Sequence, residues 1–223
     1  MLKMNPIFSL LTLFAAFNAL VLQAEAATSG PFTTSTPIPL TSTDWLGTLG
    51  FPKFNPSLGT LISVQLDLDG ALSTVLTVQN NSGTPSSGTV KTEVQLSVQD
   101  GGSNLTTPQL DLLSPNFAYS LAPSASATSG TLTKSGTSSD TYFLPAVLAE
   151  FTGPGTITLN ASSFTQTLLS NTGGNTAANQ VTSALLTGSV LYNYNSVPEP
   201  CAAALASFGL LLVAGYRRAR GIG

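Results

Sequence analysis

The 223-residue sequence predicts an all-β fold: an antiparallel β-sandwich over residues 45–195, between an N-terminal signal helix and a C-terminal transmembrane helix. Two observations predict the sandwich. Apolar and polar residues alternate along several short segments, and clusters of Gly, Pro, Asn and Ser separate those segments. A third observation, an apolar run near each end of the chain, predicts the two helices.

The predicted strands follow from the alternation, segment by segment. Residues 64–80 are expected to form a hairpin, because Asp69-Gly70 favours the turn of a two-residue loop. In residues 90–99 the side chains expected to face the core are Val90, Val94, Leu96 and Val98. Residues 156–162 and 189–195 repeat the pattern. Outside the two ends no segment has a helical period.

The first 26 residues have the three parts of a secretory signal peptide. Lys3 precedes an apolar run over 7–22, and Ala24 and Ala26 place small residues around a polar one. We therefore expect export by the Sec machinery and cleavage by signal peptidase after Ala26. An N-terminal anchor that is never cut is the alternative. Residues 27–44, rich in Ser, Thr and Pro, are expected to be a flexible lead-in.

Residues 196–223 form a second signal with three ordered parts. The first is a motif made of Val197, Pro198, Glu199 and Pro200. An apolar run over 201–216 follows, and as a helix it would cover about 24 Å, less than a hydrocarbon core of about 30 Å. The last part consists of the membrane-stop residues Arg217, Arg218 and Arg220, which favour a cytoplasmic terminus. A span of this length suits a transient anchor in the membrane.

These three parts resemble the sorting signal of PEP-CTERM proteins. The resemblance implies that an exosortase of a Gram-negative bacterium recognises the motif and removes the tail. It also implies that the protein is anchored transiently in the inner membrane and then passes to the cell surface or extracellular matrix. An ordinary single-pass anchor with a chance Pro-Glu-Pro is the alternative.

The stretch "FPKFNPSLGTLISVQLDLDG", residues 51–70, resembles the start of the choice-of-anchor E domain. The matching residues are Phe54 to Leu61 and Val64, with Asn55 where that family is expected to have Asp. The resemblance implies a β-rich ectodomain over residues 45–195. It implies no enzymatic role, because the family has none established.

Charge excludes one class of partner. Between Ala27 and Val197 there are three lysines, eight acidic residues and no arginine, which gives a net charge of −5. A nucleic-acid binder needs several cations to displace counterions from phosphates. Nucleic acid is therefore not an expected partner, and a neutral, hydroxyl-rich surface suits an extracellular matrix instead.

Catalytic and metal chemistry lack the usual residues. The chain has no histidine, and its one cysteine, Cys201, lies in the tail, so no Ser-His-Asp, Cys-His or zinc set is available. Asp67, Asp69 and Gly70 do not fit an EF-hand, since positions one and twelve would be Gln65 and Leu76. A calcium site that joins these carboxylates to distant ones stays open. We expect no enzyme activity and no cofactor.

Two functions remain after these exclusions. The first is a structural or adhesive role in the exopolysaccharide matrix. The alternative is a carbohydrate-binding module in which Trp45, Phe51 and Phe54 stack on sugar rings. Packing of the three aromatic rings in the core or at a sheet edge is the competing interpretation.

Overall fold

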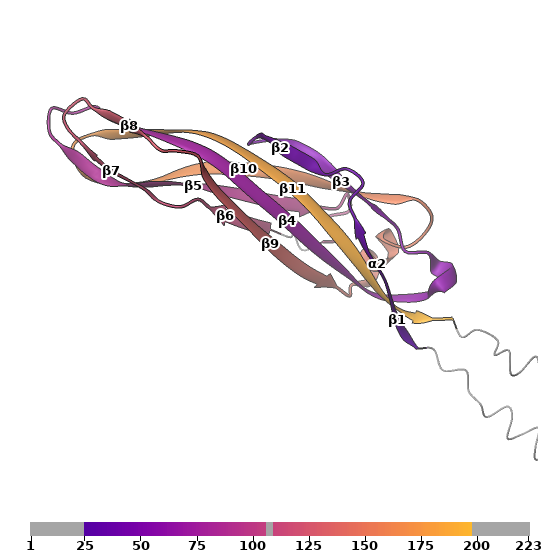
Figure 1. Ribbon diagram of the computed structural model, residues 1–223. Helices are drawn as coiled ribbons and strands as arrows, with labels where there is room; N and C mark the ends of the chain where they lie inside the picture. Colours follow the sequence, from indigo (N-terminus) through magenta and orange to yellow (C-terminus); the bar gives the residue numbers. More distant parts are fainter. Residues whose placement is uncertain (1–24, 106–108, 198–223) are drawn as a thin grey trace, which may run out of the picture. The chain divides into compact units, whose positions relative to one another are not determined.

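The computed structural model describes residues 25–105 and 109–197. These residues form antiparallel β-sheets, as the sequence predicts, together with one short α-helix that it does not predict (Figure 1). They divide into two compact units. The smaller holds residues 25–27, 57–60 and 195–197, and the larger holds 28–56, 61–105 and 109–194.

The strands belong to two sheets. The six-stranded sheet has the order β1–β11–β4–β8, with β2 also paired to β11 and β9 also paired to β4. Its strands are β1 (Ala26–Thr33), β2 (Ile38–Ser42), β4 (Gly59–Asn80), β8 (Ser126–Thr128), β9 (Leu132–Tyr142) and β11 (Thr176–Ser196). The five-stranded sheet has the order β3–β10–β5–β6, with β7 also paired to β5. Its strands are β3 (Leu46–Pro52), β5 (Ser86–Gln99), β6 (Gln109–Leu113), β7 (Phe117–Leu121) and β10 (Thr156–Gly173).

The predicted hairpin at Asp69-Gly70 is wrong, because β4 runs without a turn from Gly59 to Asn80. Every even-numbered side chain from Val64 to Asn80 is buried, so the same face continues through Gly70. A Cβ atom on Gly70 would lie 2.6 Å from Leu96 Cδ1 and 2.8 Å from Leu110 Cδ2. The glycine therefore allows the facing sheet to approach closely and makes no turn.

The lead-in predicted for residues 27–44 is also corrected, since strands β1 and β2 cover most of it. Both pair with β11, the last strand of the sheet. Between them, the Thr34 N–H donates to the Gly188 carbonyl at 2.8 Å. The long strand β11 has backbone groups that need partners along that side, and these two short strands supply partners for part of it.

Two short helices complete the described residues. The 3-10 helix η1 (Pro56–Leu58) precedes β4, and the α-helix α2 (Pro145–Glu150) lies between β9 and β10. The six residues of α2 are too few for a hydrophobic period, which is why the sequence does not reveal the helix. Proline in its first turn favours the helix start, and the buried Val147 attaches it to the core.

The core has two parts with a polar layer between them. The main core includes Leu66 of β4. The four residues of β5 that were expected to face inward are all buried: Val94, Leu96 and Val98 in the main core and Val90 in the second core. The second core contains Leu76, Val78, Val90, Tyr119 and Leu121. On β4, β5 and β11 the buried residues between the two are Thr74, Thr92 and Thr182, which we call the threonine layer.

Hydroxyl groups of the threonine layer bond within the six-stranded sheet and across to Thr92 of the five-stranded sheet. Thr74 Oγ1 lies 2.6 Å from Thr182 Oγ1 and 3.1 Å from Thr92 Oγ1. Thr92 Oγ1 also donates to Gln180 Oε1 at 2.9 Å. Every hydroxyl in this layer therefore has a partner, which a buried polar group requires.

Candidate functional site

The sorting and cleavage residues lie mainly beyond the described part of the chain. The apolar run 201–216 lies outside the described residues, and so do these single residues: Ala24, Pro198, Glu199, Pro200, Arg217, Arg218 and Arg220. Val197 is described: it is 57% exposed, and its N–H donates to the Leu58 carbonyl at 3.0 Å. Ala26 is exposed at the start of β1. Across residues 25–105 and 109–197, no helix has the length and apolarity needed to cross a bilayer.

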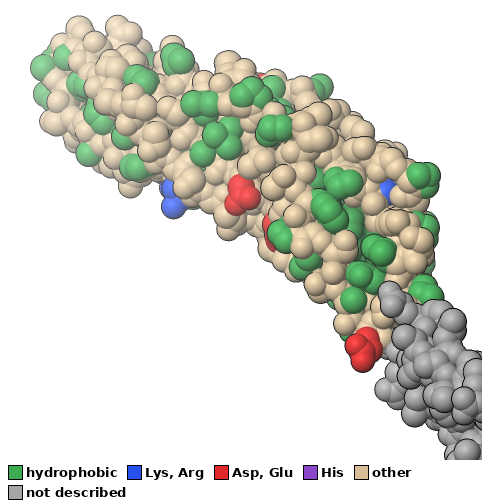
Figure 2. Space-filling view, turned by 45° about the vertical axis from the view of Figure 1, so that its right-hand side comes forward, with side chains coloured by type: hydrophobic (Ala, Val, Ile, Leu, Met, Phe, Trp, Pro, Cys, Tyr) green, Lys and Arg blue, Asp and Glu red, His purple; other side chains and the backbone are tan. Residues whose placement is uncertain are grey.

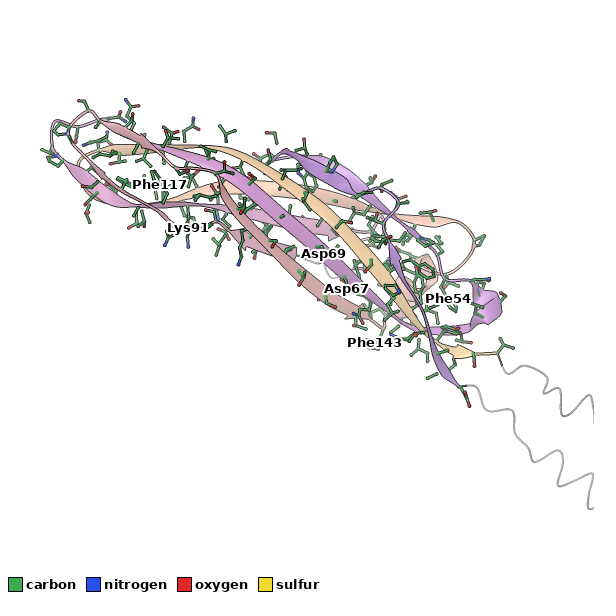
Figure 3. All side chains as sticks on the ribbon, in the orientation of Figure 1. Phe54, Asp67, Asp69, Lys91, Phe117 and Phe143 are labelled. Atoms are coloured by element: carbon green, nitrogen blue, oxygen red, sulfur yellow. The ribbon has the colours of Figure 1, made fainter. Side chains whose placement is uncertain are left out.

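The predicted aromatic platform is not formed. Phe51 and Phe54 are only 0% and 2% exposed, because both belong to the main core. The Phe54 ring packs 5.7 Å from Tyr192 and 5.1 Å from Tyr194, centre to centre (Figure 3). Neither phenylalanine can therefore stack on a sugar, and the core-packing interpretation applies to both.

Trp45 is half-buried and packs against the main core. Its indole Nε1 is buried and has no hydrogen-bond partner among the described residues. The backbone around it is fixed, since the Trp45 N–H donates to Ser163 Oγ and its carbonyl accepts the Ser163 N–H. Trp45 thus joins the start of β3 to β10, and only part of its ring can reach a ligand.

The carboxylates of Asp67 and Asp69 lie on β4, on the side of the strand that faces away from the core (Figure 3). Asp67 Oδ1 accepts hydrogen bonds from Ser139 Oγ and, at 3.0 Å, from Gln65 Nε2. Within the described ranges no three His, Cys, Asp or Glu side chains lie close enough to hold a metal ion. Asp67 is therefore hydrogen-bonded on the outer face of the sheet, and Asp69 is exposed on the same face.

A second acidic pair, which the sequence analysis did not single out, joins the β5–β6 loop to α2. Asp100 is 3% exposed and accepts the N–H groups of Asn104 and Leu105 at 2.9 and 3.0 Å. Asn104 Nδ2 donates to Glu150 Oε1, and the Asp100 and Glu150 carboxyl groups hydrogen-bond each other. Two carboxyl groups in contact share one proton.

Burial and hydrogen bonds shift the pKa values of Glu150 and Asp100 in opposite directions. For Glu150, burial and the neighbouring Asp100 raise the pKa above its ordinary value of 4.5. For Asp100, burial alone would raise the pKa, but the N–H donors of Asn104 and Leu105 and the bond from Glu150 outweigh it, and the pKa falls below 3.8. Of the two carboxyl groups, Glu150 is therefore the one that binds a proton more readily.

An exposed aromatic ring lies on the outer face of the five-stranded sheet, at Phe164 of β10, which is 59% exposed. The pairing of β10 with β5 places Phe164 beside Gln95 and Gln166 beside Glu93. Both glutamines are fixed by carboxylates: Gln166 Nε2 donates to Glu93 Oε2, and Gln95 Nε2 donates to Asp111 Oδ1 at 3.3 Å.

The same face continues into a shallow groove of about 520 Å³. Its lining residues are Thr89, Lys91, Asn116, Thr167, Leu168, Leu169 and Ser170. Lys91 is the one charged residue in that lining (Figure 3). The Phe164 ring beside its two fixed amides can stack on a sugar ring, and the hydroxyls and ammonium group of the groove can hydrogen-bond to sugar hydroxyls.

The sequence contains a signal for Phe164 that the sequence analysis did not use. Leu159 and Ala161 are buried, so the odd-numbered side chains of β10 face the core. Even-numbered residues then face outward, and an outward phenylalanine follows from counting by two. Figure 2 shows a face with few acidic and basic side chains.

Comparison with known proteins does not place the chain in a family. No family model and no curated protein matches it. Among solved structures, it is similar to a chain of the T13 IBDV viral particle, with 12% identity and a TM-score of 0.18, over 87% of this chain and 48% of that one. For a chain of infectious bursal disease virus Gt strain the values are 11%, 0.15, 83% and 51%. The chain spans about half the length of these two, and no conclusion follows from likeness at this level.

Proposed function

We propose that the protein is exported, sorted by an exosortase and delivered to the cell surface or extracellular matrix of a Gram-negative bacterium, where its β-sandwich has a structural or adhesive role. The observation that carries the proposal is the ordered tail of motif, apolar run and arginines over 197–220. It is joined at the other end of the chain by the signal peptide of residues 1–26.

The position of the motif relative to the fold supports the proposal. Strand β11 ends at Ser196, and Val197 is the next residue. Val197 is also exposed. The last described strand therefore ends next to the motif, and an enzyme that cuts there would release the chain with all of its described strands.

The outer surface supports a matrix role. Every second residue along β9 is an exposed serine or threonine, and together they form a row of hydroxyl groups: Thr133, Ser135, Thr137, Ser139 and Thr141. Such a row offers hydrogen-bond donors and acceptors without charge. A surface of this kind suits contact with hydrated polysaccharide.

Mass spectrometry of the protein recovered from its own cells tests the proposal. We expect a mature N-terminus near Ala27 and loss of the segment that contains Arg217. Glu199→Ala should block loss of the tail, because it changes the motif, whereas Glu93→Ala changes a half-buried acid of β5, far from the motif in sequence, and should leave processing unchanged. An intact chain through Gly223 at the cell surface would contradict the proposal.

Carbohydrate binding is the second candidate function, favoured by the exposed ring of Phe164 beside its fixed glutamines. Titration with linear oligosaccharides tests this binding, and the fluorescence of Trp45 is the readout. Trp45 is a suitable reporter because its backbone N–H donates to Ser163, the residue before Phe164. Phe164→Ala should abolish a saturable change, and Val181→Ala, another exposed apolar site, should not. An equal response in both variants removes this candidate.

A further inference from the structure

Among the described strands, one side of β10 has a partner strand along only part of its length. Strand β3 pairs with β10 only from Thr156 to Ser162. On its other side, β10 pairs with β5 as far as Gly173. Two contacts extend the covered part slightly: the Ser163 N–H donates to the Trp45 carbonyl, and the Thr165 N–H donates to Asp44 Oδ1. Within residues 25–105 and 109–197 no strand pairs with the rest of this side, residues 166–173, which we call the open edge.

The contacts of Ser163 and Thr165 show which backbone groups face the open edge. In an antiparallel ladder the N–H and C=O of one residue point to the same side, and alternate residues point to opposite sides. Odd-numbered residues of β10 therefore direct both groups toward the open edge. Those beyond the covered part are Thr167, Leu169 and Asn171.

The other outer strands carry features that discourage pairing with another chain, namely proline, charge or short length. Those features are Pro31 in β1, Pro39 in β2, Pro52 in β3, Asp111 in β6, and Lys134 and Asp140 in β9. Strands β7 and β8 are only five and three residues long. The open edge of β10 has none of these features, since the sequence contains no charged residue between Glu150 and Glu199.

We propose that the open edge of β10 pairs with the same edge of a second copy of this chain. The two edges would run antiparallel about a two-fold axis at Leu169, with Thr167 opposite Asn171 of the other copy. Such a contact is self-complementary and closed, as most homodimer contacts are. It joins the two five-stranded sheets into one continuous sheet and adds backbone hydrogen bonds at Thr167, Leu169 and Asn171.

Charge and side chains favour a second copy of the chain as the partner of the open edge. A second copy brings an equally uncharged edge, so no like charges meet, and two Leu169 side chains, each 37% exposed, come together at the axis. The adjacent strand β11 is less suitable as an open edge. At Gln180 the N–H is already taken by Asn179 Oδ1 at 2.9 Å.

This pairing deepens the proposed structural role, since a surface protein that pairs with itself can build a layer, but its test does not depend on sorting. Sedimentation of the full chain in detergent measures self-association. Thr167→Pro removes an N–H that faces the open edge and leaves the ladder with β5 intact. Leu169→Lys places a charge on the two-fold axis, and Gln166→Lys places the same charge on the outer face as a matched control.

We expect the dimer of the wild-type chain to weaken about tenfold or more in Thr167→Pro and Leu169→Lys, a change of about 1.4 kcal/mol or more, and less than about twofold in Gln166→Lys. Hydrogen exchange gives a second readout. Association should slow exchange at the amides of Thr167, Leu169 and Asn171, whereas that of Leu168, which faces β5, should not change. A wild-type chain that stays monomeric, or a dimer that all three variants leave equally strong, overturns the proposal.

Discussion

The main core and the second core differ in size and in how completely the sheets enclose them. The main core gathers 24 buried residues of the described chain, from both sheets and from α2. The second core has five buried residues, and the residues around it, such as Phe117 and Ala178, are only partly buried. Beside it β10 contributes no buried side chain after Ser163. The same two sheets thus form a closed sandwich at one core and an open one at the other.

The threonine layer explains how the two cores can differ within continuous strands. On β4, Leu72 belongs to the main core, Leu76 to the second core, and Thr74 lies between them. Because a hydroxyl buried here needs a hydrogen-bond partner, a shift of one strand against the facing sheet would leave it unpaired. The layer fixes the register of the sheets, and apolar burial on either side supplies the stability.

The largest expected effect comes from a charge in the main core. Leu96→Asp should lower the free energy of unfolding by more than about 4 kcal/mol, since the carboxylate would be buried without a partner. Gln95→Lys changes the next residue, which points outward next to Asp111, and should stay within about 0.5 kcal/mol. Urea denaturation measures both. Similar losses in the two variants would mean that β5 does not alternate as described.

Two leucines on the same strand compare the cores directly. Leu66 and Leu76 are both 0% exposed on β4, one in each core. Truncation of a buried leucine to alanine costs about 2 to 5 kcal/mol, and the cost is lower where neighbours can relax into the space. We expect Leu66→Ala near the upper limit and Leu76→Ala near the lower one, by urea denaturation. Equal losses would contradict the view that the second core is the looser one.

A smaller effect is expected in the threonine layer. Thr92→Val keeps the shape of the side chain but leaves Thr74 Oγ1 and Gln180 Oε1 with one partner fewer, at a cost of about 1 to 2 kcal/mol. Adding Thr74→Val to it should cost less than the sum of the two single changes, because the two hydroxyls share one network. Strict additivity in this double-mutant cycle would show that the layer does not act as a unit.

Sequence reasoning predicted the all-β fold because period-two alternation reports burial directly. It succeeded for Val94, Leu96 and Val98, where each inward residue is apolar. It failed at Asp69-Gly70, because a glycine is typical both of a turn and of a place where two sheets pack closely, and Gly70 is the second kind. The parity of Leu68 and Leu72 would have settled the matter, since a two-residue turn would bring Ala71 and Ser73 to the inward face.

For the candidate sites the limit was long-range pairing. Whether Phe51 or Phe164 is exposed depends on which sheet face each occupies, and local composition does not report this. The contact of Asp100 with Glu150 joins positions 50 residues apart, and the open edge of β10 is defined by where β3 ends. Neither is visible before the strands are placed.

The last prediction concerns the pair of Asp100 and Glu150 at the edge of the main core. Glu150 is the last residue of α2, and Val147 of the same helix packs in the main core. Because its pKa in the folded state is raised, Glu150 contributes stability below its ordinary pKa of 4.5 and loses that contribution as the pH rises through the raised value. Asp100, whose pKa is lowered, acts oppositely: its contribution is present above 3.8 and is lost as the pH falls below that. Glu150→Gln keeps an oxygen for Asn104 and has no proton to lose, so the decline in stability above pH 4.5 should disappear while the decline below pH 3.8 remains. Thermal unfolding followed across pH 3 to 8 measures this, with Asp69→Asn, an exposed acid on the outer face, as the control. A decline above pH 4.5 that persists in Glu150→Gln would show that the pair does not share a proton.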